Sequence, residues 1–233
     1  MTSPERYVII VAAGAGTRFG GERPKQFLDL GGKPVCVRAA ECFMAAIGSP
    51  EIIFALPADG FDGWRSVVDD SMAAGSRVTY VKGGATRWES VKNALAAIPA
   101  DAAPGAAVLI HDGARPLVDT PTIRRVCGAV INTDGAIPAI PVTDSLRRIG
   151  DDGVTSEPVD RADFRAVQTP QGFALWRLRQ AYALPYEKSF TDDASVMAAA
   201  GFTNIVLVAG SPDNIKITNP RDLKIAGCLI CGK

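Results

Sequence analysis

Residues Val8–Val35 read VIIVAAGAGTRFGGERPKQFLDLGGKPV, and this stretch decides the fold class of the chain. The apolar residues Tyr7–Ala12 predict a buried strand, and a glycine-rich loop follows them. Glycines allow a tight turn that directs backbone N–H groups at one point, which suits phosphate oxygens. Arg18 and Lys25 on the same loop would neutralise the charge of those oxygens. We therefore interpret the loop as a cradle for a nucleoside triphosphate.

Two common glycine motifs do not fit this loop. A P-loop requires G-x-x-x-x-G-K-[ST], and no lysine followed by serine or threonine comes after these glycines. The dinucleotide fingerprint requires G-x-G-x-x-G, whereas Gly14–Gly20 reads GAGTRFG and is too long by one residue. That fingerprint also requires an acidic residue after the second strand, but Asp29 lies inside the same loop. A glycine-rich turn without a ligand is the alternative, and the two cations argue against it.

The composition limits the class of protein. The chain has 233 residues, which suits a single domain over residues 1–233 with a sizeable core. Its 25 basic side chains equal its 25 acidic ones, so no positive excess indicates nucleic acid or a membrane surface as a partner. The start, MTSPERYVII, lacks the features of a signal peptide, and no stretch reaches the roughly 20 apolar residues of a membrane span. We therefore expect a cytoplasmic protein.

The cysteines do not suggest a disulfide framework, because there are 5 of them and they are scattered. Cys228 and Cys231 form one C-x-x-C pair, but no second pair or histidine completes a zinc site. Since the pair lies in an apolar C-terminal helix, we predict that both thiols serve packing.

Short apolar segments alternate with helical patterns along most of the chain. The predicted strands are 7–12, 51–56, 77–81, 106–110 and 202–209. The predicted helices are 34–47, 61–74, 86–98, 120–131, one opened by 191–195 and a last one after Asn219. This alternation predicts an α/β, Rossmann-like fold with a mostly parallel, twisted sheet covered by helices. Ligands of such folds bind beyond the carboxyl ends of the strands, so the loops there hold the candidate residues.

The loop after the third predicted strand reads GGATRWES over residues 83–90 and enters a helix. Thr86 and Glu89 have the spacing of a capping box. The paired glycines would let a flat base lie against bare backbone, and Ser90 could hydrogen-bond to it. The alternative is a plain strand-to-helix turn with a cap.

Asp112 lies at the end of the fourth predicted strand, in the sequence HDGARP over residues 111–116. A carboxylate at this place, beside a triphosphate loop, is suited to Mg²⁺ because hard cations take oxygen ligands. Asp112 is therefore the candidate metal ligand.

Residues 136–171 break the alternation of strands and helices. AIPAIPVTDSLRRI and GVTSEPVDRADFRAVQTPQ read as extended segments around the turn sequence Gly150–Gly153. A two-stranded arm does not bury enough surface to be stable alone. We therefore expect this arm, at about residues 142–168, to pack on a second copy of the chain in an isologous homodimer.

Lys216 is the remaining candidate, in the sequence DNIKITNP over residues 213–220. It interrupts what reads as an apolar strand, and a buried lysine is costly without a partner. A phosphate group would supply that partner. Asn219 and Pro220 predict the start of the last helix.

The stretch AAGAGTRFGGERPKQFLDLGGKPV resembles the cytidylyltransferases that act on 2-C-methyl-D-erythritol 4-phosphate in the non-mevalonate isoprenoid pathway. Its G-x-G-T-R…P-K pattern is shared by many nucleotidyltransferases, but PVTDS, TDDAS and DNIKIT narrow the resemblance, which covers nearly the whole chain. The resemblance implies a nucleotidyltransferase fold that transfers CMP from CTP to the sugar-alcohol phosphate, with Mg²⁺ as cofactor. It also implies that the arm interlocks two subunits and completes each active site.

The resemblance assigns roles to residues of this chain. The implied nucleotide-binding residues are Ala12, Ala13, Gly14, Ala15, Gly16, Thr17, Gly83, Gly84, Ala85, Arg87 and Ser90. The implied catalytic residues are Arg18 and Lys25 on the CTP phosphates, with Arg161 and Lys216 placing the substrate phosphate; Asp112, Arg115, Ser145 and Thr169 complete the substrate site. At Ala85 many relatives carry aspartate, and at Ser145 they more often carry threonine.

His111 is the only histidine, and we predict a structural role for it rather than a catalytic one. The attacking group would be a phosphate monoester, whose second pKa is near 6, so it is already anionic at neutral pH. The reaction therefore requires no general base.

Three other functions stay open at this point. The nearest is a cytidylyltransferase for ribitol 5-phosphate with the same nucleotide cradle. A nicotinamide oxidoreductase would use the glycine loop for a dinucleotide. A non-catalytic CTP-binding module would bind CTP but release no pyrophosphate.

Overall fold

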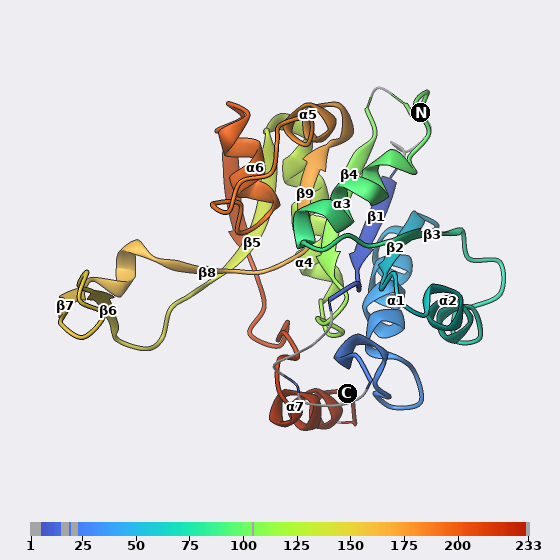
Figure 1. The fold of residues 1–233 in the computed structure, drawn as a ribbon, viewed down its shortest axis with the longest axis horizontal. Coiled ribbons are helices and arrows are strands. Elements are labelled where there is room, and N and C mark those ends of the chain that lie inside the picture. Colours follow the sequence, from blue (N-terminus) through green and yellow to red (C-terminus); the bar gives the residue numbers. More distant parts are fainter. Residues whose placement is uncertain (1–5, 15–18, 20–22, 104, 232–233) are drawn as a thin grey trace.

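Helices cover both faces of one central sheet (Figure 1). The computed structural model describes residues 6–14, 19, 23–103 and 105–231. The strands are β1 Arg6–Val11, β2 Glu51–Leu56, β3 Val78–Lys82, β4 Ala107–Asp112, β5 Gly135–Pro141, β6 Leu146–Ile149, β7 Ser156–Val159, β8 Arg165–Val167, β9 Gln171–Ala174 and β10 Ile205–Ala209. The helices are α1 Val35–Ile47, α2 Phe61–Asp69, α3 Arg87–Ala96, α4 Thr120–Ala129, α5 Leu175–Ala181, α6 Asp193–Ala199 and α7 Pro220–Cys231. Short 3-10 turns are η2 Lys25–Phe27, η3 Val130–Asn132 and η4 Arg161–Asp163.

The strand order across the sheet is β10-β5-β9-β4-β1-β2-β3. β1 pairs in parallel with β2 and β4, β2 with β3, and β5 with β10. β9 enters between β4 and β5 and runs antiparallel to both. The predicted mostly parallel α/β sheet is therefore confirmed, but β9 and the short helix α5 after it were not predicted.

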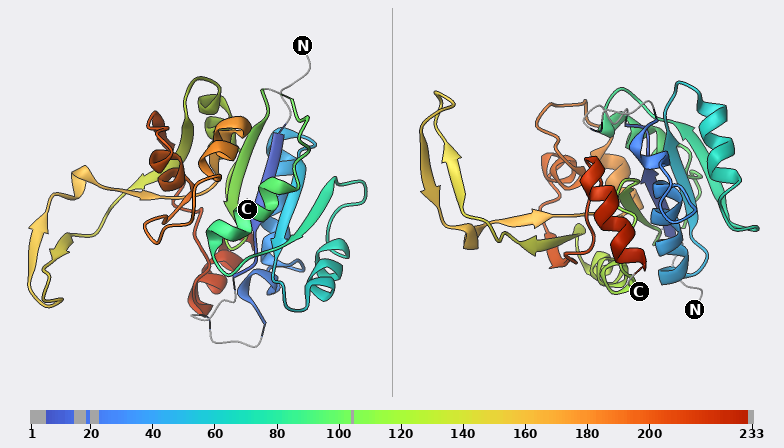
Figure 2. Two further views of the ribbon diagram at one scale, coloured as in Figure 1. Left: turned by 45° about the horizontal axis from the view of Figure 1, so that its top comes forward. Right: turned by 90° about the horizontal axis from the view of Figure 1, so that it is seen from below.

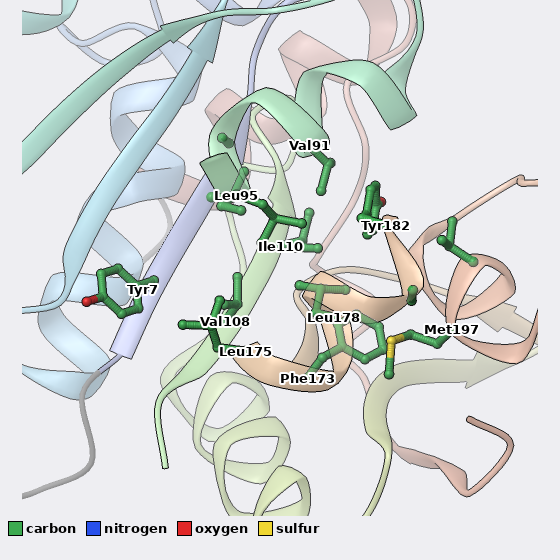
Figure 3. Packing of buried hydrophobic residues seen from close by; sticks show 14 of the residues in the cluster. Tyr7, Val91, Leu95, Val108, Ile110, Phe173, Leu175, Leu178, Tyr182 and Met197 are labelled. Carbon is green, nitrogen blue, oxygen red and sulfur yellow. The ribbon is translucent and has the colours of Figure 1, made fainter. Parts of the chain in front are cut away.

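The apolar run in β1 supplies the core on both faces of the sheet. Tyr7 and Ile9 point into one buried cluster, which α3, α5 and α6 cover (Figure 3). Val8 and Ile10 point into a second cluster on the opposite face, against α1 and α4. Because successive side chains of a strand alternate, a strand with helices on both sides must be apolar at every position.

Several local signals act as predicted. Thr86 accepts the N–H of Glu89 and the Glu89 carboxylate accepts the N–H of Thr86, so the capping box of α3 is present. Asn219 accepts the N–H of Asp222 at the start of α7. The largest boundary differences are in α2, which ends at Asp69 rather than residue 74, and in the last strand, which begins at Ile205 rather than residue 202.

Helix α7 corrects the prediction for the cysteine pair. Cys228 and Cys231 are both exposed, so their thiols do not serve packing. Ala226 is the buried residue of this helix and packs in a small cluster with Leu30, Val35 and Ile217. None of the helices formed by the described residues is long and apolar enough to cross a membrane.

The predicted arm extends away from the sheet (Figure 2). β6 and β7 form a separate two-stranded sheet, with Leu146 opposite Val159 and Ile149 opposite Ser156. Their turn is the predicted one, because the N–H of Gly150 donates to the carbonyl of Thr155. Ile149 and Val154 near the tip are 60% and 85% exposed.

Candidate active site

A cavity of about 840 Å³ opens at the carboxyl ends of β1, β2, β3 and β4. Segments far apart in the sequence line it: Ala12–Gly14 after β1, Pro57–Asp59 after β2, Gly83–Arg87 after β3, and Asp112 with Ala114 at the end of β4. Lys25 and Lys216 add charge from two further loops. The prediction that the candidate residues gather at this edge of the sheet agrees with this placement.

The centre of the glycine-rich loop falls outside the described residues. Four predicted site residues lie there: Ala15, Gly16, Thr17 and Arg18. The two ends of the loop are described, and both line the cavity, with Ala13 and Gly14 on one side and Lys25 on the other.

The loop after β3 packs closely on the loop after β1. A Cβ atom added to Gly83 would lie 2.1 Å from the Cβ of Ala13 and 3.2 Å from the carbonyl oxygen of Leu56. The Ser90 hydroxyl accepts the N–H of Gly84 at 3.1 Å and donates to the carbonyl of Thr86 at 2.9 Å. Ser90 therefore orders the backbone that would face a base, and Gly84 and Ala85 line the cavity beside it.

Asp112 is the charged centre of the site. Lys216 Nζ lies 2.8 Å and Arg115 Nε lies 3.6 Å from its Oδ2, while Arg87 Nε lies 3.4 Å from its Oδ1. Burial alone would raise the pKa of this carboxyl, but Arg87, Lys216 and Arg115 together hold it well below its ordinary value. Asp112 is therefore ionised at neutral pH and organises three cations.

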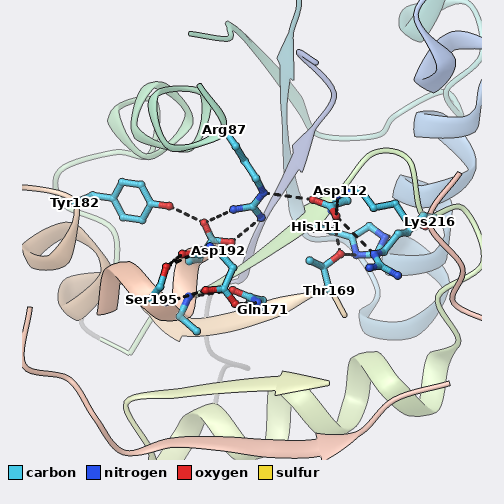
Figure 4. Close-up of polar contacts among 12 residues, drawn as sticks. Arg87, His111, Asp112, Thr169, Gln171, Tyr182, Asp192, Ser195 and Lys216 are labelled. Atoms are coloured by element: carbon cyan, nitrogen blue, oxygen red, sulfur yellow. Dashed lines mark hydrogen bonds and ion pairs between the residues drawn. The ribbon is translucent and has the colours of Figure 1, made fainter. Parts of the chain in front are cut away.

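Arg87 joins this centre to a second buried carboxylate (Figure 4). Its Nη1 and Nη2 donate to Asp193 at 2.9 and 2.7 Å, and the Tyr182 hydroxyl donates to the same carboxylate at 2.6 Å. Burial opposes the charge on Arg87, but Asp193 and Asp112 keep its pKa above its usual value. The terminal nitrogens of Arg87 are thus engaged with Asp193, and its predicted contact with nucleotide stays a prediction.

No pattern in the sequence indicated the role of Asp193. It lies in the TDDAS segment, which predicts a helix start, and Asp192 does cap α6. The ion pair joins Arg87, the first residue of α3, to Asp193, the first residue of α6, and the two residues are 106 positions apart in the chain.

His111 is fully buried and both of its ring nitrogens are engaged. The carbonyl of Arg115 can only accept, so His111 Nε2 carries a proton and donates to it at 2.9 Å. Burial lowers the pKa of His111 to about 4, so its Nδ1 is bare and accepts the Thr169 hydroxyl at 2.9 Å. The Thr169 oxygen in turn accepts the N–H of Asp112. This arrangement agrees with the structural role predicted for His111.

Thr169 and Arg115 lie behind the cavity wall rather than on it. The Thr169 hydroxyl donates its hydrogen bond to His111 Nδ1, so it has no second hydrogen to donate to a substrate. Arg115 Nη1 donates to the carbonyl of Asn214 at 2.7 Å, and Asn214 Nδ2 donates to the carbonyl of Thr169 at 2.8 Å. These contacts fix the loop that carries Lys216.

The predicted setting of Lys216 was wrong. Residues 213–218 form no strand, and the Lys216 side chain is 39% exposed. Its charged partner is Asp112, and beside it in the chain Ile215 is half-buried and Ile217 is fully buried. The conclusion that Lys216 carries charge into the site holds, for this different reason.

Arg161 and Ser145 lie on the arm and do not line the cavity of their own chain. Both are exposed, and Arg161 Nη1 donates to the carbonyl of Thr143 within the arm. Figure 2 shows the arm reaching away from the sheet. The structure therefore brings together the described residues of the nucleotide half with Lys216, and leaves the two arm residues apart from them.

The donor set suits Mg²⁺ only in company with phosphates. Among the described residues no group of three or more His, Cys, Asp or Glu side chains could hold a metal ion. Mg²⁺ is commonly held by one or two carboxylates plus substrate phosphate oxygens and water. Asp112 Oδ1 is the carboxylate oxygen that could bind Mg²⁺ in this way, because its charged partner, Arg87 Nε, lies at 3.4 Å.

Loops with glycines, two lysines and one carboxylate meet at the carboxyl edge of the α/β sheet, which is the arrangement expected of a nucleotidyltransferase. The family model IspD, 2-C-methyl-D-erythritol 4-phosphate cytidylyltransferase, matches residues 7–231. The chain belongs to this family.

Individual relatives agree over nearly the full length. The 2-C-methyl-D-erythritol 4-phosphate cytidylyltransferase of Phocaeicola vulgatus is 43% identical over 225 residues, which are 97% of this chain and 99% of that protein. The crystal structure of the Thermus thermophilus enzyme of the same name has a TM-score of 0.74 at 33% identity and covers 97% of this chain and 98% of its own. The bifunctional enzyme IspD/IspF of Mesorhizobium japonicum is 42% identical, and the match spans 94% of this chain but 53% of that protein.

Proposed function

We propose that this chain transfers CMP from CTP to 2-C-methyl-D-erythritol 4-phosphate, giving 4-diphosphocytidyl-2-C-methyl-D-erythritol and pyrophosphate. The single observation that carries the proposal is the convergence of Lys25, Lys216 and Asp112 with two glycine loops around one cavity. Family membership names the substrates, and the same cavity explains why phosphates would bind there. The proposal also places the protein in the cytoplasm. It further includes a homodimer, in which the arm of the partner supplies Arg161 and Ser145 to each active site.

The reaction on this proposal is an in-line substitution at the α-phosphorus of CTP. A phosphate oxygen of the substrate attacks, forming a new P–O bond, and the bond to the bridging oxygen breaks with its electron pair leaving on pyrophosphate. Lys25 and Arg18 neutralise the charge that builds up on the nucleotide phosphates, and Lys216 with Arg161 holds the attacking phosphate. Mg²⁺, held by Asp112 and phosphate oxygens, would neutralise further phosphate charge.

Pyrophosphate release tests this function directly. The assay compares CTP, UTP, ATP and GTP, each with 2-C-methyl-D-erythritol 4-phosphate and with ribitol 5-phosphate, in the presence and absence of Mg²⁺. We expect release with CTP and the erythritol phosphate. Preferential turnover of the ribitol phosphate would assign the alternative substrate, and CTP binding without release would indicate a non-catalytic module.

Lys25→Ala tests the proposed charge neutralisation. Because a cation aimed at a transferring phosphoryl group acts mainly in the transition state, we expect kcat to fall on the order of 10³-fold, with a much smaller loss of CTP affinity. Steady-state kinetics and CTP titration measure the two quantities. Equal losses of kcat and affinity would contradict the role. Arg18→Ala is expected to behave alike.

A further inference from the structure

Gln26 is a buried polar residue that lines the cavity and has no role in the proposed reaction. It is the middle residue of η2, directly after Lys25, and is 3% exposed. Its Nε2 donates to the carbonyl of Ala12 at 2.5 Å and to the carbonyl of Gly14 at 2.7 Å. Both hydrogens of one side-chain amide thus bind the first turn of the glycine-rich loop.

These two hydrogen bonds join the two ends of the glycine-rich loop. They join Gln26 to residues 14 and 12 positions earlier in the chain, so the segment that carries Lys25 is tied to the end of β1. The next residue, Phe27, is 1% exposed and stacks on Trp64 with ring centroids 4.4 Å apart. Lys25 therefore lies on a turn whose two following side chains are both fixed in place.

The bonds also set which way the loop backbone faces. In a peptide unit the C=O and the N–H of the next residue point in opposite directions. Capture of the Ala12 carbonyl by Gln26 therefore turns the N–H of Ala13 away from Gln26, and Ala13 lines the cavity. The hydrogen bond from Gln26 also directs the carbonyl oxygen toward Gln26, which reduces its electrostatic repulsion of an anionic ligand.

We propose that Gln26 is a positioning residue for the nucleotide: it orients the loop peptides and the Lys25 turn so that they bind a triphosphate. This inference rests on the proposed CTP-binding function. It requires a neutral amide, since only –NH₂ offers two hydrogens to two carbonyls. A glutamate of the same shape would present lone pairs to both.

Gln26→Glu is the sharpest variant, and Gln26→Met removes the donors without adding charge. We expect Gln26→Glu to weaken CTP binding by about 100-fold and Gln26→Met by about tenfold at neutral pH, measured by calorimetry with MgCl₂ present. The KM for the sugar phosphate should change by less than about twofold, because Gln26 touches only the nucleotide loop. Val126→Ala, a fully buried core position on α4, provides a destabilised control with unchanged CTP affinity.

A pH series gives a readout that loss of folding would not produce. A buried glutamate beside two carbonyls gains a proton as the pH falls, and the protonated form can donate one hydrogen bond. The deficit of Gln26→Glu relative to the wild type should therefore shrink several-fold between about pH 8.5 and about pH 5.5. Gln26→Met should show no such recovery.

The outcomes separate this inference from the function on which it rests. A wild-type chain that does not bind CTP would remove the proposed function. Wild-type CTP binding that both Gln26 variants retain would overturn the role of Gln26 alone. A matching loss of CTP affinity in Val126→Ala would also overturn it, because folding would then explain the effect.

Discussion

Asp193 shows how one fully buried carboxylate can control a site that it does not line. It is 0% exposed and accepts two hydrogen bonds from Arg87 and one from Tyr182. The third nitrogen of the Arg87 guanidinium faces Asp112. The charge on Arg87 is therefore shared between a structural carboxylate and a functional one, and Asp193 limits how far Arg87 can move toward the cavity.

We expect Asp193→Asn to lower the free energy of unfolding by about 3 kcal/mol, because Arg87 would remain buried without its counter-charge. It should also lower kcat, since Arg87 would then pair more strongly with Asp112 and compete with Lys216. Urea unfolding and steady-state kinetics measure both effects. Tyr182→Phe is the matched control: it keeps the ring stacked on Trp88 and removes one hydrogen bond, at a cost of about 1 kcal/mol. Equal effects of the two variants would count against this account.

His111 makes the stability of the fold depend on pH. Its pKa falls from 6.5 to about 4 in the folded chain because of burial. Above about pH 6.5 His111 is neutral in both the folded and the unfolded chain, so its titration causes no change of stability with pH there. As the pH falls from 6.5 toward 4, His111 binds a proton in the unfolded chain but not in the folded chain. The free energy of unfolding therefore falls by on the order of 3 kcal/mol.

Urea unfolding at several pH values between these limits measures this loss. His111→Gln should be less stable at neutral pH but should show a flatter profile below about pH 6.5. The low pKa of Asp112 acts in a separate range, since the stability that it provides is lost only as the pH falls below 3.8, the ordinary pKa of an aspartate. A variant with the wild-type slope would show that another group titrates in this window.

At the scale of elements, the loops after β1 and β3 can pack closely because residue 83 is a glycine without a side chain. The space at Gly83 is closed by Ala13, with only 2.1 Å between the two Cβ positions. Since Ala13 belongs to the glycine-rich loop, a side chain at residue 83 must push that loop out of place. The contact explains the glycine at residue 83 better than backbone freedom does, because its φ is not positive.

We expect Gly83→Ala to weaken CTP binding by about tenfold or more, because the displaced Ala13 carries the loop peptides with it. Gly128→Ala is the control, since a Cβ at that helical position meets nothing within 4 Å. This control should raise stability by about 0.5–1 kcal/mol and leave CTP affinity unchanged. Calorimetry and thermal unfolding measure the two properties. Unchanged affinity in Gly83→Ala would show that the loops can separate without loss of the cradle.

The elements predicted from the sequence were those with their own local signal. β1, β2 and the capped helix α3 have apolar runs or caps within a few residues, and the structure confirms them. β9 was missed because its four residues, QGFA, carry no alternation, and the neighbours β4 and β5 define it. Lys216 was placed in a strand because DNIKIT is apolar around it, whereas hydrogen bonds from Asn214 and Arg115 hold that segment as a loop.

The site was predictable to the extent that loops at one sheet edge must meet. The parallel order of β1, β2, β3 and β4 brings Gly14, Gly83 and Asp112 to one cavity, as the alternation of strands and helices implied. The buried partners were not predictable. Gln26 and Asp193 each bond to residues that no short pattern links to them, so only the folded chain reveals their contacts.

At the scale of the whole molecule, the position of the arm bears on whether its residues belong to the active site of the same chain or of a second copy. Its exposed apolar residues Ile149 and Val154 extend from the sheet with little of their own surface buried. Arg161 is exposed on this arm and does not line the active-site cavity of its own chain. In the homodimer that we propose, a second copy related by two-fold symmetry would bury the arm, and each Arg161 would reach the other chain's cavity.

Mixing two inactive variants tests this arrangement. Lys216→Ala damages the cavity of its own chain but leaves a sound arm, and Arg161→Ala does the reverse. In a mixed dimer, the cavity of the Arg161→Ala chain would receive a sound arm from its partner. Unfolding and refolding equal amounts together should therefore restore about a quarter of the wild-type activity, since half of the dimers are mixed and each has one complete site. Each variant refolded alone should stay inactive. If Arg161 served its own chain, every site in the mixture would carry one defect, and no activity would return.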